Sequence, residues 1–208
     1  MLTYEQMNQL LEGLSELHQT MLLLDALAGL RRCELFALRR MDVDLEHREI
    51  HVRQRVYNGQ MDSPKSTTSI RDLLIPPKLA QRLQALLRKS SGEPSALLFP
   101  GKNGRPLSAT TVMRRVIKPA LKKLGLPDVS WHSFRRTLGT WLRHRNAHVK
   151  TIKEQLGHAN PATTLDLYIG SVSDDRRAVI DEIEGQLSFG PKRTQIRRRR
   201  GKVLELSA

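Results

Sequence analysis

The stretch 131-WHSFRRTLGTWLRHRNAHVKTIKEQLGHANPATTLDLYIG-170 holds the polar side chains around which the rest of this chain is organised. His132 and Arg135 are three residues apart, so they share one face if this segment is helical. Gly157 is typical of a helix end and predicts the end of a second helix, which begins near Val149. The pattern therefore predicts two helices, with a histidine and an arginine directed the same way from the first.

A third, shorter helix is predicted in the remainder of this stretch. Asn160-Pro161 is typical of a helix N-cap followed by the first helical residue. His158 then lies at the junction between two helices, and Tyr168 lies near the end of a helix that stops at Gly170. We expect the three turns to converge on one point.

The arginine and the histidines in the same stretch as Tyr168 suit a phosphate target. A phenol, with its reference pKa of about 10, is a poor nucleophile unless cations stabilise the phenolate. The planar fork of an arginine can donate two hydrogen bonds to two phosphate oxygens, and a histidine adds a donor or a base. Together, the tyrosine, the arginine and the histidines indicate covalent attack on a phosphodiester.

The boxes H-S-F-R, L-G-H and T-T-L-D-L-Y occur in the order and spacing of the tyrosine recombinase (phage-type integrase) family, which this chain resembles. The family's usual form of the box that begins at His132 is H-x-L-R-H, and in this chain Phe134 and Arg136 fill its third and fifth places. His158 and Tyr168 are ten residues apart, where many members have nine. The resemblance implies that Tyr168 is the nucleophile and that His132, Arg135 and His158 are catalytic.

An earlier segment, 29-GLRRCEL-35, matches the first arginine box of that family, G-L-R-x-x-E-L. The resemblance implies that Arg31 is the other catalytic arginine and that Glu34 orients it. The alternative is that Arg31 only decorates a helix N-terminus, which is an electrostatically poor place for a cation.

The middle of the chain changes to a two-residue period. Ile50–Val56 alternates apolar and polar residues and predicts a strand, Asn58-Gly59 predicts a hairpin turn, and Ile70–Ile75 predicts another strand. Pro64-Lys65-Ser66, followed by Arg71 and Ile75-Pro76, resembles the family's β-hairpin string. The resemblance implies that Lys65 is the general acid, whereas a loop lysine is usually only solvated.

Helix signals flank these strands. Thr3 and Gln6 form a possible capping box, and helices are predicted over about Gln19–Ala28 and Pro77–Lys89. Ser108 is expected to cap a basic helix, in which Pro119 should cause a kink or an early end.

Basic residues on and after that helix are candidate contacts to the DNA backbone, although a charge run is usually a solvated face. The candidates are Arg114, Arg115, Lys118, Lys122 and Arg136.

Composition narrows the class of protein. The 208 residues carry 35 basic and 21 acidic side chains, a net charge of +14, which favours nucleic acid as the partner over an anionic membrane. The single cysteine, Cys33, excludes an internal disulfide and fits a reducing cytoplasm. The N-terminus shows no signal peptide, and Met21–Leu30 is too short an apolar run for a membrane span. Zinc-ligand spacings and nucleotide-binding glycine loops are absent, so we expect neither a metal nor a cofactor.

The predicted fold is α+β and mainly helical, with a small antiparallel sheet. We expect an integrase-type catalytic domain over residues 1–188 and a basic tail over 189–208 that is disordered in isolation. We also expect the N-terminal core-binding domain of most family members to be absent from this sequence.

The resemblance implies a DNA recombinase or integrase that acts through a 3′-phosphotyrosine link, on double-stranded DNA, as a tetramer on paired sites. Arg31 and Arg135 would stabilise the phosphate charge, Lys65 would protonate the leaving oxygen, and the histidines would move protons. Two alternatives are a type IB topoisomerase and a non-catalytic DNA-binding fragment.

Removal of residues 190–208 should weaken the salt dependence of non-specific DNA binding, because it deletes seven basic residues and one acidic residue. Each phosphate contact adds about 0.9 to the slope of log affinity against log salt. The measurement is a salt titration of DNA affinity. A full-length chain with the tail cations changed to glutamine serves as the length control, and an unchanged slope would show that the tail makes no phosphate contacts.

Overall fold

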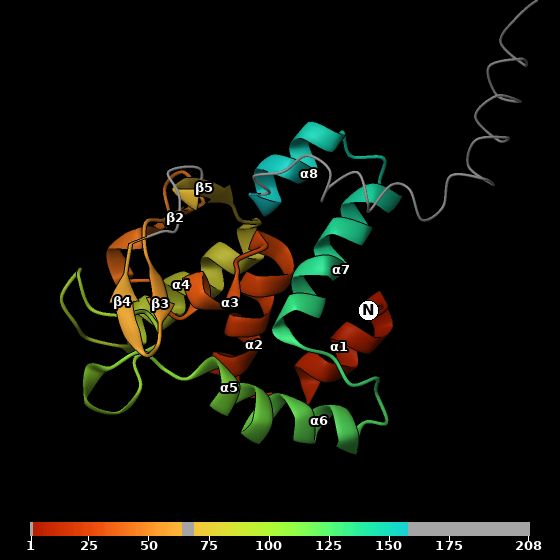
Figure 1. The fold of residues 1–208 in the computed structure, drawn as a ribbon, viewed down its shortest axis with the longest axis horizontal. Coiled ribbons are helices and arrows are strands. Elements are labelled where there is room, and N and C mark those ends of the chain that lie inside the picture. Colours follow the sequence, from red (N-terminus) through yellow and green to blue (C-terminus); the bar gives the residue numbers. More distant parts are fainter. Residues whose placement is uncertain (1, 64–68, 158–208) are drawn as a thin grey trace, which may run out of the picture. The chain divides into compact units, whose positions relative to one another are not determined.

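Helices make up most of the fold, and the strands gather on one side of them (Figure 1). The computed structural model describes residues 2–63 and 69–157. Its helices are α1 (Tyr4–Glu12), α2 (Glu16–Leu23), α3 (Arg32–Leu35), α4 (Pro77–Lys89), α5 (Ala109–Val112), α6 (Lys118–Lys123), α7 (Trp131–His144) and α8 (Val149–Leu156). Its strands are β1 (Val43–Asp44), β2 (Glu49–Val52), β3 (Arg55–Tyr57), β4 (Gln60–Asp62) and β5 (Arg71–Leu74). The prediction of a mainly helical α+β fold is confirmed.

The first two helices form where the sequence places them, with different bounds for the second. The Thr3 hydroxyl accepts a hydrogen bond from the Gln6 backbone N–H at 3.2 Å, and the Gln6 side-chain oxygen accepts one from the Thr3 backbone N–H at 3.0 Å, so the predicted capping box is confirmed. The helix predicted over Gln19–Ala28 begins earlier and changes at its end into a π-helical turn, Leu24–Ala28. Hydrophobic periodicity does not distinguish these two kinds of turn, so the sequence did not indicate the change.

The strands form two separate antiparallel sheets rather than one. β1, β2 and β5 pair in that order, and β3 pairs only with β4, across the turn formed by Asn58-Gly59. The single strand predicted over Ile50–Val56 is therefore wrong, because the chain leaves the first sheet at Arg53 and Gln54. The Gln54 amide donates to the Ala37 carbonyl at 2.7 Å, which secures the bend. Alternation of apolar and polar residues continues across this bend, so the pattern alone could not show it.

The basic helix also differs from its prediction. Ser108 caps it as expected, accepting a hydrogen bond from the Thr111 N–H at 3.2 Å. Pro119 was expected to kink or end the helix early, but helical structure continues from α5 through a π-helical turn, Met113–Ile117, into α6. Pro119 comes just after the π-helical turn, so its missing backbone N–H falls where the hydrogen-bond pattern changes from π to α.

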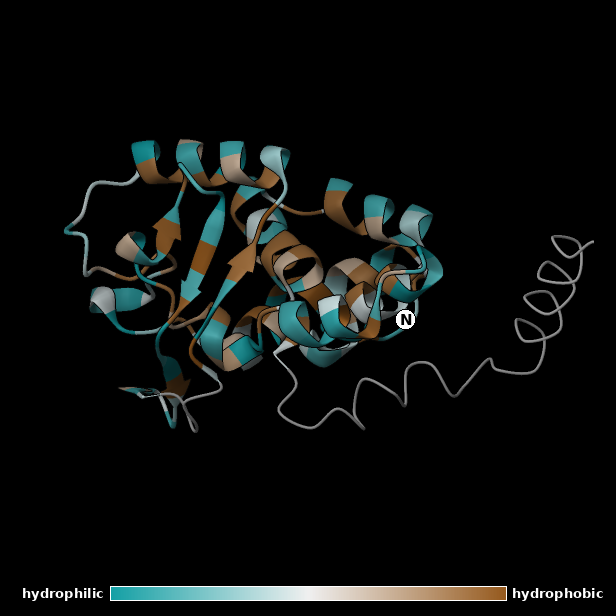
Figure 2. Cartoon of the chain, turned by 90° about the horizontal axis from the view of Figure 1, so that it is seen from above, coloured by the Kyte–Doolittle hydropathy of each residue, from teal (hydrophilic) through white to brown (hydrophobic). Residues whose placement is uncertain are grey.

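The core lies between the helices and the three-stranded sheet, and hydrophobic segments line the inner faces of both (Figure 2). Trp131 begins α7 and packs edge-on against Phe36 and Phe134, with ring centroids 5.4 Å and 6.2 Å apart. Its indole N–H donates to the Ala109 carbonyl, and the buried ring packs α7 against the core. In the described part of the chain, no helix is long and apolar enough to cross a membrane. The predicted boundary at residue 188 lies outside that part and stays a prediction.

Gly29→Ala should destabilise the fold. Gly29 has a φ of +71°, which costs an alanine about 1–2 kcal/mol. A methyl group there would also lie 3.0 Å from a methyl carbon of Leu138 and of Leu156, which adds roughly another 1 kcal/mol. Chemical denaturation measures the loss. Gly59→Ala is the matched control, because Gly59 has a φ of +76° but open space around it. An equal loss in both variants would show that packing around Gly29 contributes nothing.

Candidate active site

Arg31 stands at the N-cap of α3, one residue before the helix begins. Glu34, three residues later, accepts a hydrogen bond from the Arg31 guanidinium at 2.8 Å and another from the Arg31 backbone N–H at 2.8 Å. The predicted pairing of these two residues is therefore present. The carboxylate offsets the poor position of a cation at a helix N-terminus and fixes the direction of the Arg31 side chain.

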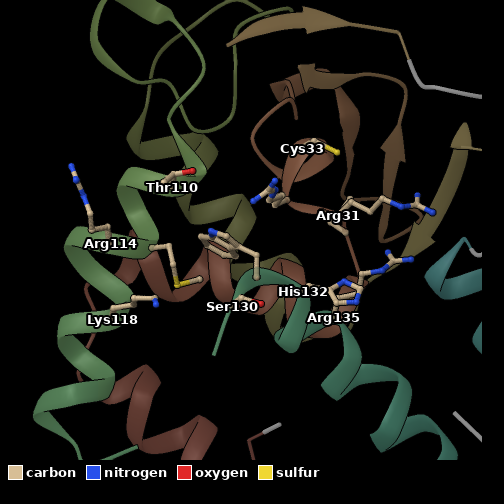
Figure 3. A pocket seen from close by; sticks show the side chains of 12 residues that line it. Arg31, Cys33, Thr110, Arg114, Lys118, Ser130, His132 and Arg135 are labelled. Carbon is tan, nitrogen blue, oxygen red and sulfur yellow. The ribbon is translucent and has the colours of Figure 1, made fainter. Parts of the chain in front are cut away.

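Arg135 reaches the same region from α7. Its side chain is buried, and its two terminal nitrogens donate to the backbone carbonyls of Gly29 and Leu156. His132 lies one turn earlier on α7, and in Figure 3 it lies beside Arg135, while Arg31 and Arg135 extend to the same side. The spacing of three residues thus brings His132 and Arg135 together, as the sequence predicted.

The end of α8 completes this arrangement. Gly157 ends the helix in the left-handed conformation, as predicted, with a φ of +58°. Its carbonyl accepts a hydrogen bond from Arg31 at 2.7 Å, and the preceding carbonyl of Leu156 accepts one from Arg135. Cations are favourable at a helix C-terminus, where unpaired carbonyls gather. Two arginines distant in sequence are therefore held together by one helix end.

Burial and repulsion between cations determine the pKa values of Arg135 and His132. Burial, with repulsion from Arg31, lowers the pKa of Arg135 to about 10, so the side chain remains a cation at neutral pH. Burial, assisted by Arg136 and Arg135, lowers the pKa of His132 below its usual 6.5, so its ring is mostly neutral at pH 7. The group thus combines two fixed cations with a neutral imidazole that can accept a proton.

A cavity of about 560 Å³ opens beside these residues, between α3, α7 and the basic helix (Figure 3). Part of its wall is apolar, formed by Leu30, Met113 and Trp131. The full lining is Leu30, Arg31, Arg32, Cys33, Thr110, Met113, Arg114, Lys118, Ser130, Trp131, His132 and Arg135. Six of these twelve residues are Arg, Lys or His, so the cavity suits an anion.

The candidate DNA-contact residues divide into two groups. Arg114 and Lys118 line the cavity, and Lys118 also pairs with Asp128 at 2.9 Å. Arg115, Lys122 and Arg136 are exposed but do not line it. Lys65, His158 and Tyr168 lie outside the described residues. Their roles stay predictions.

Two further residues belong to this site, although the sequence pattern assigned them no role in it. Arg71 of β5 binds Glu34, and Asp25 is fully buried in the π-helical turn Leu24–Ala28, where it interacts electrostatically with Arg135. Burial raises the pKa of Asp25 well above its usual range, with Arg135 opposing that effect. The sequence feature that could have pointed to Arg71 is its position in the string that resembles the family's β-hairpin. For Asp25, that feature is an acidic residue inside the apolar run Met21–Leu30.

A cluster with metal-ligand chemistry lies elsewhere, on the three-stranded sheet. Glu49, His51 and Asp72 place their ligand atoms within 4.8 Å of one another. Asp72, however, already pairs with His51 at 2.7 Å and with Arg53 at 2.5 Å. A cation therefore has to compete with an arginine there, and we assign the cluster no metal.

Comparison with known proteins identifies the family. A model of the phage integrase family matches residues 1–173. The prophage phiRv2 integrase of Mycobacterium tuberculosis is 30% identical over an alignment of 182 residues, which covers 84% of this chain and 48% of that protein. A tyrosine recombinase XerC-like protein of Caldanaerobacter subterraneus is 25% identical, over 74% of this chain and 46% of its own length.

Solved structures show the same architecture. The Tn1549 transposon integrase, solved in complex with circular intermediate DNA, superposes with a TM-score of 0.76 at 25% identity, covering 88% of this chain and 66% of that chain. The XerA recombinase, at 22% identity and a TM-score of 0.67 over 89% of this chain and 64% of that chain, shows the fold alone. This chain spans about half the length of the curated relatives. Since the family match runs over residues 1–173, this chain belongs to the phage integrase family, which confirms the resemblance read from its arginine, histidine and tyrosine boxes.

Proposed function

We propose that this chain cleaves and rejoins DNA strands as the catalytic part of a site-specific recombinase or integrase, through a 3′-phosphotyrosine intermediate. The observation that supports this most is the joint anchoring of Arg31 and Arg135 at the end of α8, beside His132 and a cationic cavity. Two fixed guanidinium groups suit the non-bridging oxygens of a phosphate, where charge develops during attack.

In the proposed reaction, the Tyr168 oxygen attacks the phosphorus and loses its proton, with His132 or His158 as the acceptor. The bond from phosphorus to the 5′ oxygen breaks, and Lys65 gives a proton to that oxygen, so a 5′-hydroxyl leaves. The strand keeps its 3′ phosphate as an ester of Tyr168. Attack by a 5′-hydroxyl on this ester reverses the steps and rejoins the strand. No nucleotide cofactor is implied, because the ester conserves the energy of the broken bond.

The proposed partner is double-stranded DNA, supported by the DNA-bound structure of the Tn1549 transposon integrase and by the net charge of +14. Self-association on paired sites as a tetramer and a cytoplasmic location are further parts of the proposal. Both follow from the family resemblance.

Two other functions remain as alternatives. A type IB topoisomerase would use the same ester but relax supercoils without paired sites. A DNA-binding fragment without turnover is the other. Nicked suicide duplexes that carry candidate sites separate both cleaving proteins from the binding fragment, because only a cleaving protein becomes trapped on such DNA. Relaxation of supercoiled DNA that lacks paired sites then separates the topoisomerase from the recombinase.

Tyr168→Phe should abolish covalent capture of DNA while folding and DNA binding survive, because the substitution removes only the hydroxyl. The measurement is an adduct that survives boiling in detergent on a denaturing gel, followed by peptide mapping of the linked residue. Tyr4→Phe and Tyr57→Phe, at the two other tyrosines of the chain, are the matched controls and should form the adduct normally.

An adduct that persists in Tyr168→Phe, or that maps to Tyr4 or Tyr57, would show that another residue is the nucleophile. The absence of any adduct with the unaltered chain, on paired as well as single sites, would instead favour the DNA-binding fragment.

Cleavage should slow as the pH falls through the lowered pKa of His132, below 6.5, because protonation removes its capacity to accept a proton. His132→Gln should slow cleavage by roughly 10²-fold at neutral pH and remove this acid limb. Single-turnover rates between pH 5 and pH 8 (roughly the window in which a histidine titrates) measure both effects. If the variant keeps the same acid limb, another group is responsible for it.

A further inference from the structure

Arg71, on β5, places a third arginine beside the two that the proposed function uses. Its side chain is only 9% exposed. Its two terminal nitrogens donate to the two carboxylate oxygens of Glu34, at 3.0 Å and 2.8 Å, in the bidentate geometry that gives strong, directional pairing. One of them also donates to the Ser69 carbonyl at 3.0 Å. Arg71 is therefore fixed to β5 and to α3 at once.

Glu34 is shared between Arg71 and Arg31. One carboxylate oxygen accepts from the Arg31 guanidinium, the other accepts from the Arg31 backbone N–H, and each also accepts from Arg71. A single negative charge is thus divided between two cations. Without Arg71, Glu34 would be free to turn wholly toward Arg31 and neutralise it, which would weaken the attraction of Arg31 for a phosphate.

Arg71 also lies against the turn at the end of α8. A methyl group added to Gly157 would lie 2.4 Å from the Arg71 Nε and 2.7 Å from its Cδ, so the arginine packs directly on this glycine. The carbonyl of the same residue accepts from Arg31 at 2.7 Å. Arg71 therefore touches both groups that hold the Arg31 side chain, namely Glu34 and Gly157.

We propose that Arg71 is a positioning residue for Arg31, which it keeps correctly directed and incompletely neutralised by holding the Glu34 carboxylate and packing on Gly157. This inference rests on the proposed function, because it assigns Arg31 to the scissile phosphate. Arg71 itself need not touch DNA. Through Arg31, it helps to stabilise the transition state of cleavage. Its loss should therefore change the rate of cleavage more than the affinity for DNA.

A double-mutant cycle between Arg71 and Arg31 tests the proposal in the full chain. Arg71→Gln should lower the single-turnover cleavage rate by about 10- to 100-fold, by analogy with the loss of a group that orients a ligand at a metal site. In the Arg31→Lys background the same substitution should cost less than about threefold, because the residue that it serves is already altered. Arg71→Lys should restore part of the rate, since lysine keeps the charge but not the two-pronged geometry.

Arg39→Gln is the matched control. Arg39 pairs with the buried Asp42 three residues later, through its backbone N–H at 2.8 Å and through guanidinium bonds to both carboxylate oxygens. It does not line the cavity. Its loss should lower stability without a specific loss of cleavage. Equal losses for Arg71→Gln in both backgrounds, or an equal loss in the Arg39 control, would overturn the positioning role.

A second measurement does not depend on DNA cleavage. The Arg31 amide is protected by Glu34, so its hydrogen exchange should become faster in Arg71→Gln but not in Arg39→Gln, while exchange in α4 stays unchanged. Unchanged exchange at Arg31 would overturn the proposal. If the unaltered chain forms no adduct on any suicide duplex, the proposed function fails, and the exchange result still decides whether Arg71 holds Glu34 and Arg31 in place.

Discussion

The arrangement of the site depends on two backbone carbonyl groups at the C-terminal end of α8. Leu156 and Gly157 present them, and Arg135 and Arg31 donate to them. Arg31 is 126 residues away from its acceptor, so this contact closes the chain from its first third onto its last described helix. A helix C-terminus attracts cations without neutralising them, because it offers partial charges rather than a full one. The arginines are thereby placed and still carry charge.

Holding cations in a buried place has a cost, and the charges around them show how the fold limits it. The lowered pKa of Arg135, about 10, corresponds to a cost on the order of a few kcal/mol. Glu34 is the acid that compensates, shared between Arg31 and Arg71. Asp25 lies close enough to interact with Arg135, but its own burial raises its pKa and favours the neutral form. One shared carboxylate among three arginines leaves an excess of positive charge, which an anion in the cavity would relieve.

Features that depend on neighbouring residues could be predicted from the sequence, whereas those that depend on distant contacts could not. The Asn58-Gly59 turn and the helix over Pro77–Lys89 were predicted correctly, because local conformational preference determines them. The pairing of Arg31 with Glu34 was implied by the family resemblance, and it too joins residues only three positions apart. The link from Glu34 to Arg71 crosses 37 residues, and only the pairing of β5 with β2 places Arg71 there. A periodic pattern contains no information on which strands pair, so neither this link nor the change of sheet after β2 was expected.

The cations around the cavity differ in how firmly they are held, and this difference implies a division of work. Arg31 and Arg135 have their donors fixed by backbone and carboxylate partners, so little ordering remains to be done when a phosphate arrives. Arg114 and Lys118 also line the cavity but are exposed, and the surface pair that Lys118 makes with Asp128 is worth little. Such side chains give affinity that falls with salt and depends weakly on exact geometry. The contribution of the first pair should therefore appear in the rate of strand cleavage, and that of the second group in the affinity for DNA. Changes on the exposed helix can then alter where the protein binds without disturbing the arginines that would act on the phosphate.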